Sequence, residues 1–201
     1  MFMKLADYCT DLNILDESKN IQPWEFLLEL EDHIEEQLVS LGNEYKKIQG
    51  VAIHKSAVVE PTATINAPAI IGPGCFIGSH SLIRGGVILG EGVSIGPSCE
   101  VKHSIVGKRT SFAHFNFVGD SIIGSEVNLE AGAVIANHFN ERDDKTIYVL
   151  ANGAKTDIGL TKFGAIIGDK VKIGANAVTS PGTLLPIGSV VGRLELVEQI
   201  K

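Results

Sequence analysis

The sequence predicts a mainly β fold, a parallel β-helix wound from six-residue repeats, on three observations. An apolar residue stands at every sixth position from Ile53 to Val101. Hydrophobic residues make up 44% of the chain and aromatic residues only 6%, which favours a narrow, layered core of aliphatic side chains. The 22 glycines lack the period of three that collagen requires, so we interpret them as turn residues between many short strands.

The repeat is regular around its apolar position. Glycine often follows that position, and a small or β-branched residue stands four places after it. Each six-residue unit supplies a short strand and a turn, and three units form one triangular coil of about eighteen residues with its apolar side chains inside. We therefore expect stacked coils around one core. The apolar positions of the unbroken run are Ile53, Val59, Ile65, Ile71, Ile77, Ile83, Leu89, Ile95 and Val101.

The period continues beyond this run and is interrupted once. Two five-residue steps, from Val101 to Val106 and from Val118 to Ile123, leave the register intact. A long interruption over about 138–165 precedes a second block, which is led by Ile167, Ile173, Leu185 and Val191. The sequence therefore predicts a β-helix over 51–193 with one inserted loop, followed by a short C-terminal tail over 194–201.

A helix is predicted before the first coil, from Pro23 to Leu41. Its apolar residues lie on one helical face and its acidic residues largely on the other. Pro23 suits a first helical turn, and Gly42 suits the end. Because the first coil of a β-helix must be covered, we interpret 1–50 as an N-terminal α-helical cap, with an oligomer contact as the alternative.

Charge and cysteine content limit the function classes. A formal net charge of −7 argues against a general nucleic-acid or membrane-surface role, because both partners select basic faces. Cys9, Cys75 and Cys99 are odd in number and widely spaced, which is typical of reduced thiols rather than of a disulfide framework. The N-terminus has no signal-peptide core and no transmembrane run, so we expect a cytoplasmic protein.

Arg84 and Lys102 are the first candidates for a binding site. They stand eighteen residues apart in the repeat, so we expect one to lie directly above the other on the same face. Both replace the small residue that usually follows the apolar position. Two stacked cations would suit a phosphate group, and the alternative is that they are two solvated surface charges.

His114 is the leading candidate for a general base. It stands in the segment FAHFNFVGD, between apolar residues. Imidazole is the side chain best suited to accept a proton near neutral pH, although a lone histidine is more often structural. The other histidines show neither two residues five apart nor an HxxxH pattern, so we expect no zinc site. We interpret His80, His103 and His138 as surface or cleft residues, with His138 a weak candidate for substrate contact.

The run from Arg84 to Thr146 resembles the acetyltransferase domain of the bacterial glucosamine-1-phosphate acetyltransferase family. The similarity is carried by EVKHSIVGK, AHFNFVGDSIIGSEVN, AGAVIAN and DDKT. The resemblance implies a left-handed β-helix, a homotrimer, and acetyl-CoA bound in a groove between neighbouring subunits. It also implies acetyl transfer to an amino-sugar phosphate, with no metal required.

The resemblance assigns residues by position. It implies phosphate binding by Arg84 and Lys102, catalysis by His114, substrate-amide contacts by Asn128 and Asn137, and a CoA contact by Ala131. The sequence also departs from the family: Phe117 replaces a tyrosine that contacts substrate, Asp143 replaces a lysine for which Lys145 could substitute, and Glu130 replaces a glycine beside the expected pantetheine path. These departures concern the acceptor more than the reaction type.

The segment from Thr156 to Gly192 resembles the C-terminal domains of archaeal-type sugar-phosphate nucleotidyltransferases, in which a lysine at the position of Lys162 reaches the substrate site. No glycine-rich nucleotidyltransferase loop of the LAAGxGTR type occurs in the sequence, so we do not expect UDP-sugar synthesis. The leading hypothesis is an acyl-CoA-dependent N-acyltransferase acting on a phosphorylated amino sugar or a sugar nucleotide. The alternative is a non-catalytic sugar-nucleotide-binding or assembly module.

Overall fold

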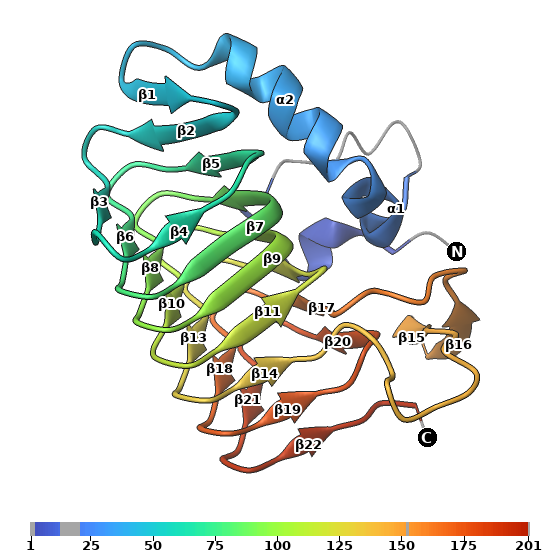
Figure 1. Cartoon of the computed structure of the whole chain (residues 1–201). Coiled ribbons are helices and arrows are strands. Elements are labelled where there is room, and N and C mark those ends of the chain that lie inside the picture. The colour runs from blue at the N-terminus through green and yellow to red at the C-terminus, as the bar shows by residue number, and fades with distance from the viewer. Residues whose placement is uncertain (1–2, 13–20, 152, 201) are drawn as a thin grey trace.

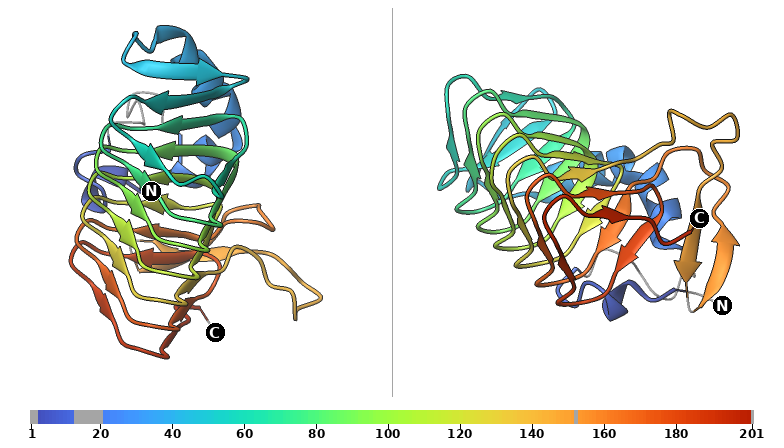
Figure 2. Two further views of the ribbon diagram at one scale, coloured as in Figure 1. Left: turned by 60° about the vertical axis from the view of Figure 1, so that its left-hand side comes forward. Right: turned by 90° about the horizontal axis from the view of Figure 1, so that it is seen from below.

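The computed structural model describes residues 3–12, 21–151 and 153–200 of the chain. The polypeptide winds into a parallel β-helix whose coils stack along one axis, with helices on one flank and an inserted segment that stands out from one corner (Figures 1 and 2). The winding is left-handed, as the resemblance implies. None of the described helices is long and apolar enough to cross a membrane.

Each coil contributes one strand to each of three faces. The first face contains β2 (Val51–His54), β5 (Ala69–Ile71), the second halves of β7 (Leu82–Leu89) and β9 (Glu100–Val106), β12 (Ile122–Ile123), β17 (Ala165–Ile167) and β20 (Thr183–Leu185). The second face contains β3 (Val58–Val59), β6 (Phe76–Ile77), β8 (Ser94–Ile95), β10 (Ser111–Phe112), β13 (Asn128–Leu129), β18 (Lys172–Ile173) and β21 (Val190–Val191). The third face contains β4 (Thr64–Ile65), the first halves of β7 and β9, β11 (Phe117–Gly119), β14 (Val134–Ile135), β19 (Val178–Thr179) and β22 (Leu196–Val197).

The predicted apolar positions form the core of the β-helix, which confirms the period. Ile71, Ile83 and Ile95 are each fully buried, and the corresponding residues of the other coils pack in the same cluster. The two end coils are less buried, because one side of each has no further coil against it: Ile53 and Val197 are partly exposed. Stacking is so close at Gly96 that a Cβ there would stand 1.6 Å from the carbonyl oxygen of Ala113, which explains glycine after the apolar position.

The predicted helix forms, but it is divided into α1 (Pro23–Leu28) and α2 (Leu30–Ser40) at Glu29, whose φ of −101° and ψ of 9° are not helical. A 3₁₀ turn, η1 (Leu5–Asp7), precedes it. Along the three-residue strands of the first face, neighbouring side chains point to opposite sides, so Ile70 and Ile166 point outward. Trp24 and Ile34 pack on them in a second core.

The helices of the predicted cap therefore lie against the outer side of the first face rather than over the end of the first coil. The strand β1 (Tyr45–Ile48) pairs antiparallel with β2 and covers the edge of the first coil. At the other end, β22 pairs with β19, so the β-helix continues into the part that the sequence predicts as a tail. The reason is that Val197 stands six residues after Val191 and keeps the period.

The predicted insertion is present between β14 and β17. It contains an antiparallel hairpin of β15 (Tyr148–Ala151) and β16 (Ala154–Asp157), which the sequence reading does not predict. Phe139, Ile147 and Phe163 anchor the insertion in the second core. The three cysteines are free and buried, as expected for reduced thiols, and burial raises the pKa of the Cys9 thiol.

Candidate functional site

Arg84 and Lys102 lie side by side at the end of the third face, as their spacing predicts. They are paired residues of β7 and β9. Each cation is already matched by a carboxylate: Nη2 of Arg84 lies 2.6 Å from Oε1 of Glu100, and Nζ of Lys102 lies 3.1 Å from Oδ2 of Asp120. The two stacked cations are therefore compensated by carboxylates of the same chain.

Asp120 is the centre of this part of the site, and the sequence reading missed it. Its Oδ1 lies 2.9 Å from Nδ1 of His103, and its Oδ2 accepts hydrogen bonds from Lys102 and from the side-chain amide of Asn137. Burial opposes ionisation of this carboxyl group, but the hydrogen bonds from His103, Asn137 and Lys102 outweigh it and lower the pKa of Asp120 to about 2. The repeat gives no signal for this contact, because the five-residue step makes this coil seventeen residues long and pairs Lys102 with Gly119, one residue before Asp120.

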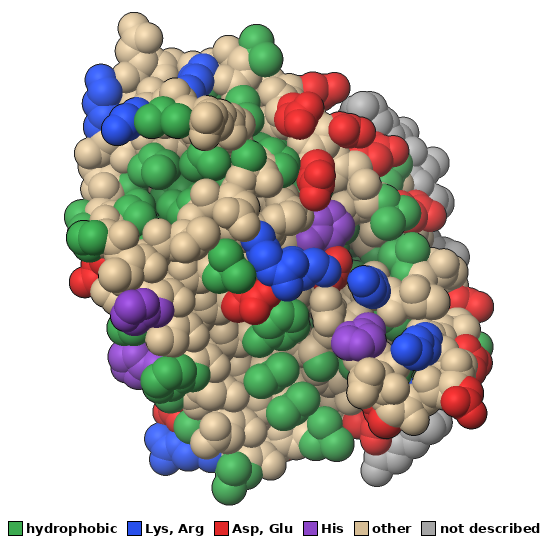
Figure 3. All heavy atoms as spheres, in the orientation of Figure 1, with side chains coloured by type: hydrophobic (Ala, Val, Ile, Leu, Met, Phe, Trp, Pro, Cys, Tyr) green, Lys and Arg blue, Asp and Glu red, His purple; other side chains and the backbone are tan. Residues whose placement is uncertain are grey.

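A cavity of about 300 Å³ opens beside Asp120, between α1 and the end of the insertion. Its apolar wall consists of Trp24, Leu27, Leu28, Leu160 and Phe163. Its polar residues are His103, Asp120, Thr161 and Lys162. Lys162 is thereby placed next to the Asp120 cluster, and basic side chains gather near the middle of the face shown in Figure 3.

His114 lies at the opposite end of the third face from Lys102. It follows β10 at the corner between the second and third faces, and its side chain is exposed. In the next coil, Ala131 lies beside it, since the amide of Gly132 donates to the carbonyl of His114 at 2.8 Å. Asn128, exposed on β13, precedes Ala131 by three residues.

The predicted site residues thus fall into two groups on one chain. Phe117 of β11 lies on the third face between the two ends. Lys145 is exposed in the insertion and belongs to neither group. The first group, around Asp120, contains Arg84, Lys102, Asn137 and Lys162; the second contains His114, Asn128 and Ala131. A ligand that used both groups would lie across Phe117.

Glu130 is held in place beside Ala131. Its carboxylate accepts two hydrogen bonds from Arg193, at 2.8 and 3.0 Å, and one from the amide of Ala175 at 2.9 Å. The Arg193 bond and the Ala175 bond lower the pKa of Glu130 to about 2. The sequence marks Glu130 as a departure from the family but gives no sign of a partner 63 residues away.

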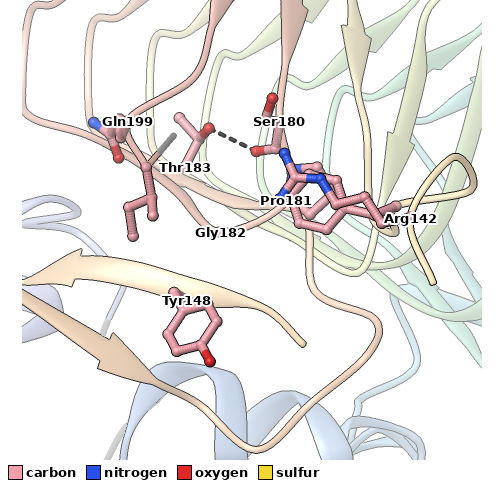
Figure 4. A pocket seen from close by; sticks show the side chains of 9 residues that line it. Arg142, Tyr148, Ser180, Pro181, Gly182, Thr183 and Gln199 are labelled. Carbon is pink, nitrogen blue, oxygen red and sulfur yellow. Dashed lines mark hydrogen bonds between the residues drawn. The ribbon is translucent and has the colours of Figure 1, made fainter. Parts of the chain in front are cut away.

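A second hollow lies between the β15–β16 hairpin and the last coils (Figure 4). Arg142 stacks on Phe139 at 3.6 Å from the ring centroid and pairs with Glu198 at 2.9 Å. The hollow holds only about 20 Å³, which is room for a single water molecule. It is therefore no candidate for a substrate site. Among the described residues, no three His, Cys, Asp or Glu side chains are grouped as metal ligands.

Comparisons with known proteins agree with this architecture. The family model described as "GMPPB C-terminal domain" matches residues 47–148, and "Hexapeptide repeat of succinyl-transferase" matches residues 164–192. The chain is 38% identical over 125 residues to "Bifunctional protein GlmU" of Methanococcus vannielii, covering 62% of this chain and 29% of the relative. It is 36% identical over 147 residues to "Bifunctional sugar-1-phosphate nucleotidylyltransferase/acetyltransferase" of Sulfurisphaera tokodaii, covering 71% and 36%.

The chain spans about a third of the length of these two relatives. Among solved structures, the acetyltransferase domain of PglB from Neisseria gonorrhoeae FA1090 in complex with acetyl coenzyme A aligns over 82% of this chain and 62% of its own. The TM-score is 0.44 and the identity 17%. A similarity of that size says nothing about substrate.

Proposed function

This chain belongs to the family of the GMPPB C-terminal domain, whose model matches residues 47–148, and on that premise we propose that it is an acyl-CoA-dependent acyltransferase acting on a phosphorylated amino sugar. The single observation that carries the proposal is the convergence of Lys102, Asn137 and Lys162 on the Asp120 corner. Three separate stretches of sequence supply these residues. The resemblance implies a substrate contact for each of them.

The proposed mechanism assigns one step to each group of residues. Lys102, with Arg84 beside it, holds the phosphate of the acceptor and orients the sugar along the third face. His114 accepts a proton from the amine as its nitrogen attacks the thioester carbon. The nitrogen–carbon bond forms, the carbon–sulfur bond breaks, and the sulfur of CoA takes the proton from His114 as it leaves. Asn128 or a backbone amide stabilises the developing oxyanion.

The position of His114 supports a shared site in a homotrimer with acetyl-CoA as the cosubstrate. The corner that carries His114 and Ala131 is open on one chain, and large apolar side chains near it are solvent-facing: Phe115 is 69% exposed and Leu194 is 79% exposed. Exposed apolar residues of this size mark an interaction surface. We propose that a neighbouring β-helix covers this corner and that the pantetheine arm of acetyl-CoA lies between the two subunits.

A second candidate function is a non-catalytic module that binds sugar nucleotides or assembles with other proteins. Phe117 favours it, because it lacks the hydroxyl group of the tyrosine found in the resembling family. Arg84 also favours it, because its guanidinium already pairs with Glu100, and a phosphate would have to compete with that carboxylate. Both candidates share the fold, so turnover separates them.

The test is release of free thiol from acetyl-CoA in the presence of a panel of amino-sugar phosphates. We expect His114→Ala to lower kcat by about a hundredfold or more, the contribution typical of a general base. The matched control is His80→Asn, a histidine at the same corner two coils earlier with φ of 62°, a conformation that Asn tolerates; it should retain the wild-type rate. No turnover on any acceptor, with no thermal stabilisation by CoA, would leave only the binding module.

A further inference from the structure

The first coil of the β-helix is open at its outer end. The strand β1 covers the edge of the first face, but β3 pairs with β6 alone and β4 pairs with β7 alone. As a result, the inward-facing residues Ile53, Val59 and Ile65 are only partly buried. The apolar interior of the β-helix can therefore be reached from this end.

A cavity of about 450 Å³ occupies this opening. Its apolar residues are Ile48, Val51, Ile53, Ile65 and Ala67. Its polar residues are Lys46, Gln49 and Asn66. Figure 3 shows basic side chains beside apolar ones at the end of the molecule that carries β1 and β2 in Figure 1. The volume lies within the range of small-molecule pockets, which usually combine an apolar lining with a few polar groups.

Lys46 and Lys47 are neighbours in β1 and point to opposite sides of the strand. Lys46 stands opposite Ile53 in the antiparallel pair, so its side chain lies on the inner side together with that of Ile53. Lys47 lies on the outer side, where its ammonium group donates to the carbonyls of Leu38 at 2.6 Å and Leu41 at 2.5 Å. Lys47 therefore has a structural role at the end of α2, and Lys46 has no part in it.

The charge of Lys46 is not matched by a carboxylate of the described chain. None of the ion pairs between described residues includes it, and it is the one charged residue in the described lining of the cavity. The exposed side chains of Gln49 and Asn66 add amide N–H donors beside it. The opening thus presents one positive charge and neutral donors above an apolar floor.

We propose that this opening, the first-coil mouth, binds a small aliphatic monocarboxylate. The carboxylate accepts N–H groups of Lys46, Gln49 and Asn66. The hydrocarbon chain enters the first coil and covers Ile53 and Ile65, which no further coil covers. Burial of apolar surface supplies the affinity, and the charge of Lys46 selects the head group. The site uses none of the residues of the proposed function and does not depend on it.

The number of charges in the lining favours a monoanion over other ligand classes. A phosphate ester or a nucleotide carries more negative charge than one cation can match, and the described lining has no second cation. An uncharged hydrocarbon would cover the apolar floor but would leave the ammonium group of Lys46 without a partner at the edge of a low-dielectric cavity. An aliphatic monocarboxylate matches both the floor and the charge.

A series of carboxylates of increasing length tests the site directly. We would titrate the full-length protein, without CoA, with butanoate, hexanoate and octanoate and measure binding by isothermal titration calorimetry. Each step adds two methylene groups and should strengthen binding about tenfold. Octylamine, with the opposite charge, should bind at least about tenfold more weakly than octanoate. Affinity that does not rise with chain length, or equal affinity for octanoate and octylamine, would overturn the proposal.

Two pairs of variants assign the residues. Lys46→Ala should weaken octanoate binding about tenfold, whereas Lys55→Ala removes an exposed lysine of the same coil outside the lining and should bind as wild type does. Ile48→Asp should abolish measurable binding, because it places a negative charge in the wall of the mouth. Val58→Asp makes the same change at a residue that is 57% exposed and outside the lining, so it should bind normally. Wild-type affinity in Lys46→Ala or Ile48→Asp, shown to be folded by urea unfolding, would overturn the site.

Reversal of the charge and the oligomeric state separate the ligand site from other uses of this surface. Lys46→Glu should bind octylamine more tightly than octanoate. A lysine on the inner side of an edge strand can also serve only to prevent pairing with another chain; wild type would then bind no octanoate, and Lys46→Ala would self-associate in sedimentation. If a second copy covered the mouth, wild type would bind no octanoate and Ile48→Asp would lower its oligomeric state. Either result would overturn the proposed ligand.

Discussion

Replacement of Asp120 by asparagine would remove the negative charge on which three side chains converge. Lys102 would lose its ion-pair partner at 3.1 Å, and His103 and Asn137 would lose the charged acceptor of their hydrogen bonds. In the folded protein the pKa of Asp120 falls from 3.8 to about 2. At 1.36 kcal/mol per unit, this shift corresponds to a stabilisation of about 2 kcal/mol at neutral pH.

The pH dependence identifies the carboxylate as the source of that stability. Because the folded-state pKa of Asp120 lies below its usual value, its contribution is present in full above about pH 4 and is lost as pH falls toward about 2. We expect Asp120→Asn to be less stable than wild type by about 2 kcal/mol near pH 7. The two proteins should approach equal stability in strong acid.

Urea unfolding at a series of pH values measures this difference in the free energy of unfolding. An equal m-value for the two proteins would show that both expose the same surface area on unfolding. The matched control is Asp157→Asn, an exposed aspartate of β16, which should follow wild type at every pH. A deficit for Asp120→Asn that stays constant down to about pH 3, or one below about 0.5 kcal/mol at neutral pH, would refute the ionised network.

Three further substitutions have defined outcomes. Gly96→Ala should destabilise the fold by more than about 2 kcal/mol, because its Cβ would meet the carbonyl oxygen of Ala113 at 1.6 Å, as urea unfolding would show. Ile34→Ala should cost about 2–5 kcal/mol by the same measurement, because this side chain is fully buried between the helices and the first face. Glu130→Gly should lower the KM for acetyl-CoA. It removes a negative charge that repels the phosphates of CoA, and it releases Arg193 to bind them.

Each of these substitutions has a control. Gly90→Ala places its Cβ no closer than 3.1 Å to any neighbour, so it should cost less than Gly96→Ala. Val39→Ala, at a position 85% exposed on the same helix as Ile34, should be close to neutral. Glu126→Gly removes a different exposed carboxylate that pairs with an arginine and should leave the KM for acetyl-CoA unchanged. Equal effects within any pair would contradict the stated cause.

The β-helix could be predicted from sequence because its period is local and strict. Every sixth residue from Ile53 to Val101 is apolar and points inward, and the same spacing from Val191 to Val197 continues the β-helix into the strand β22. The lateral position of α1 and α2 could not be predicted. It depends on outward-facing residues such as Ile70 and Ile166, which look the same in sequence as the inward-facing residues beside them.

The site was predictable only in part, for a related reason. The eighteen-residue period placed Arg84 beside Lys102, but it gave no information on Glu100 and Asp120 as their counter-ions. The cavity depends on contacts between residues far apart in the chain, because its wall combines Trp24, which precedes the β-helix, with Phe163 at the end of the insertion. Such long-range packing leaves no periodic trace in the sequence.

The central claim is that this β-helix transfers an acyl group to an acceptor recognised by its phosphate. The measurement that tests it most directly is kcat/KM for thiol release from acetyl-CoA, compared between glucosamine 1-phosphate and glucosamine. Two charge-assisted hydrogen bonds to the phosphate predict a preference of about a hundredfold for the phosphorylated sugar. Equal values for the two acceptors, or no release with either, would contradict the account.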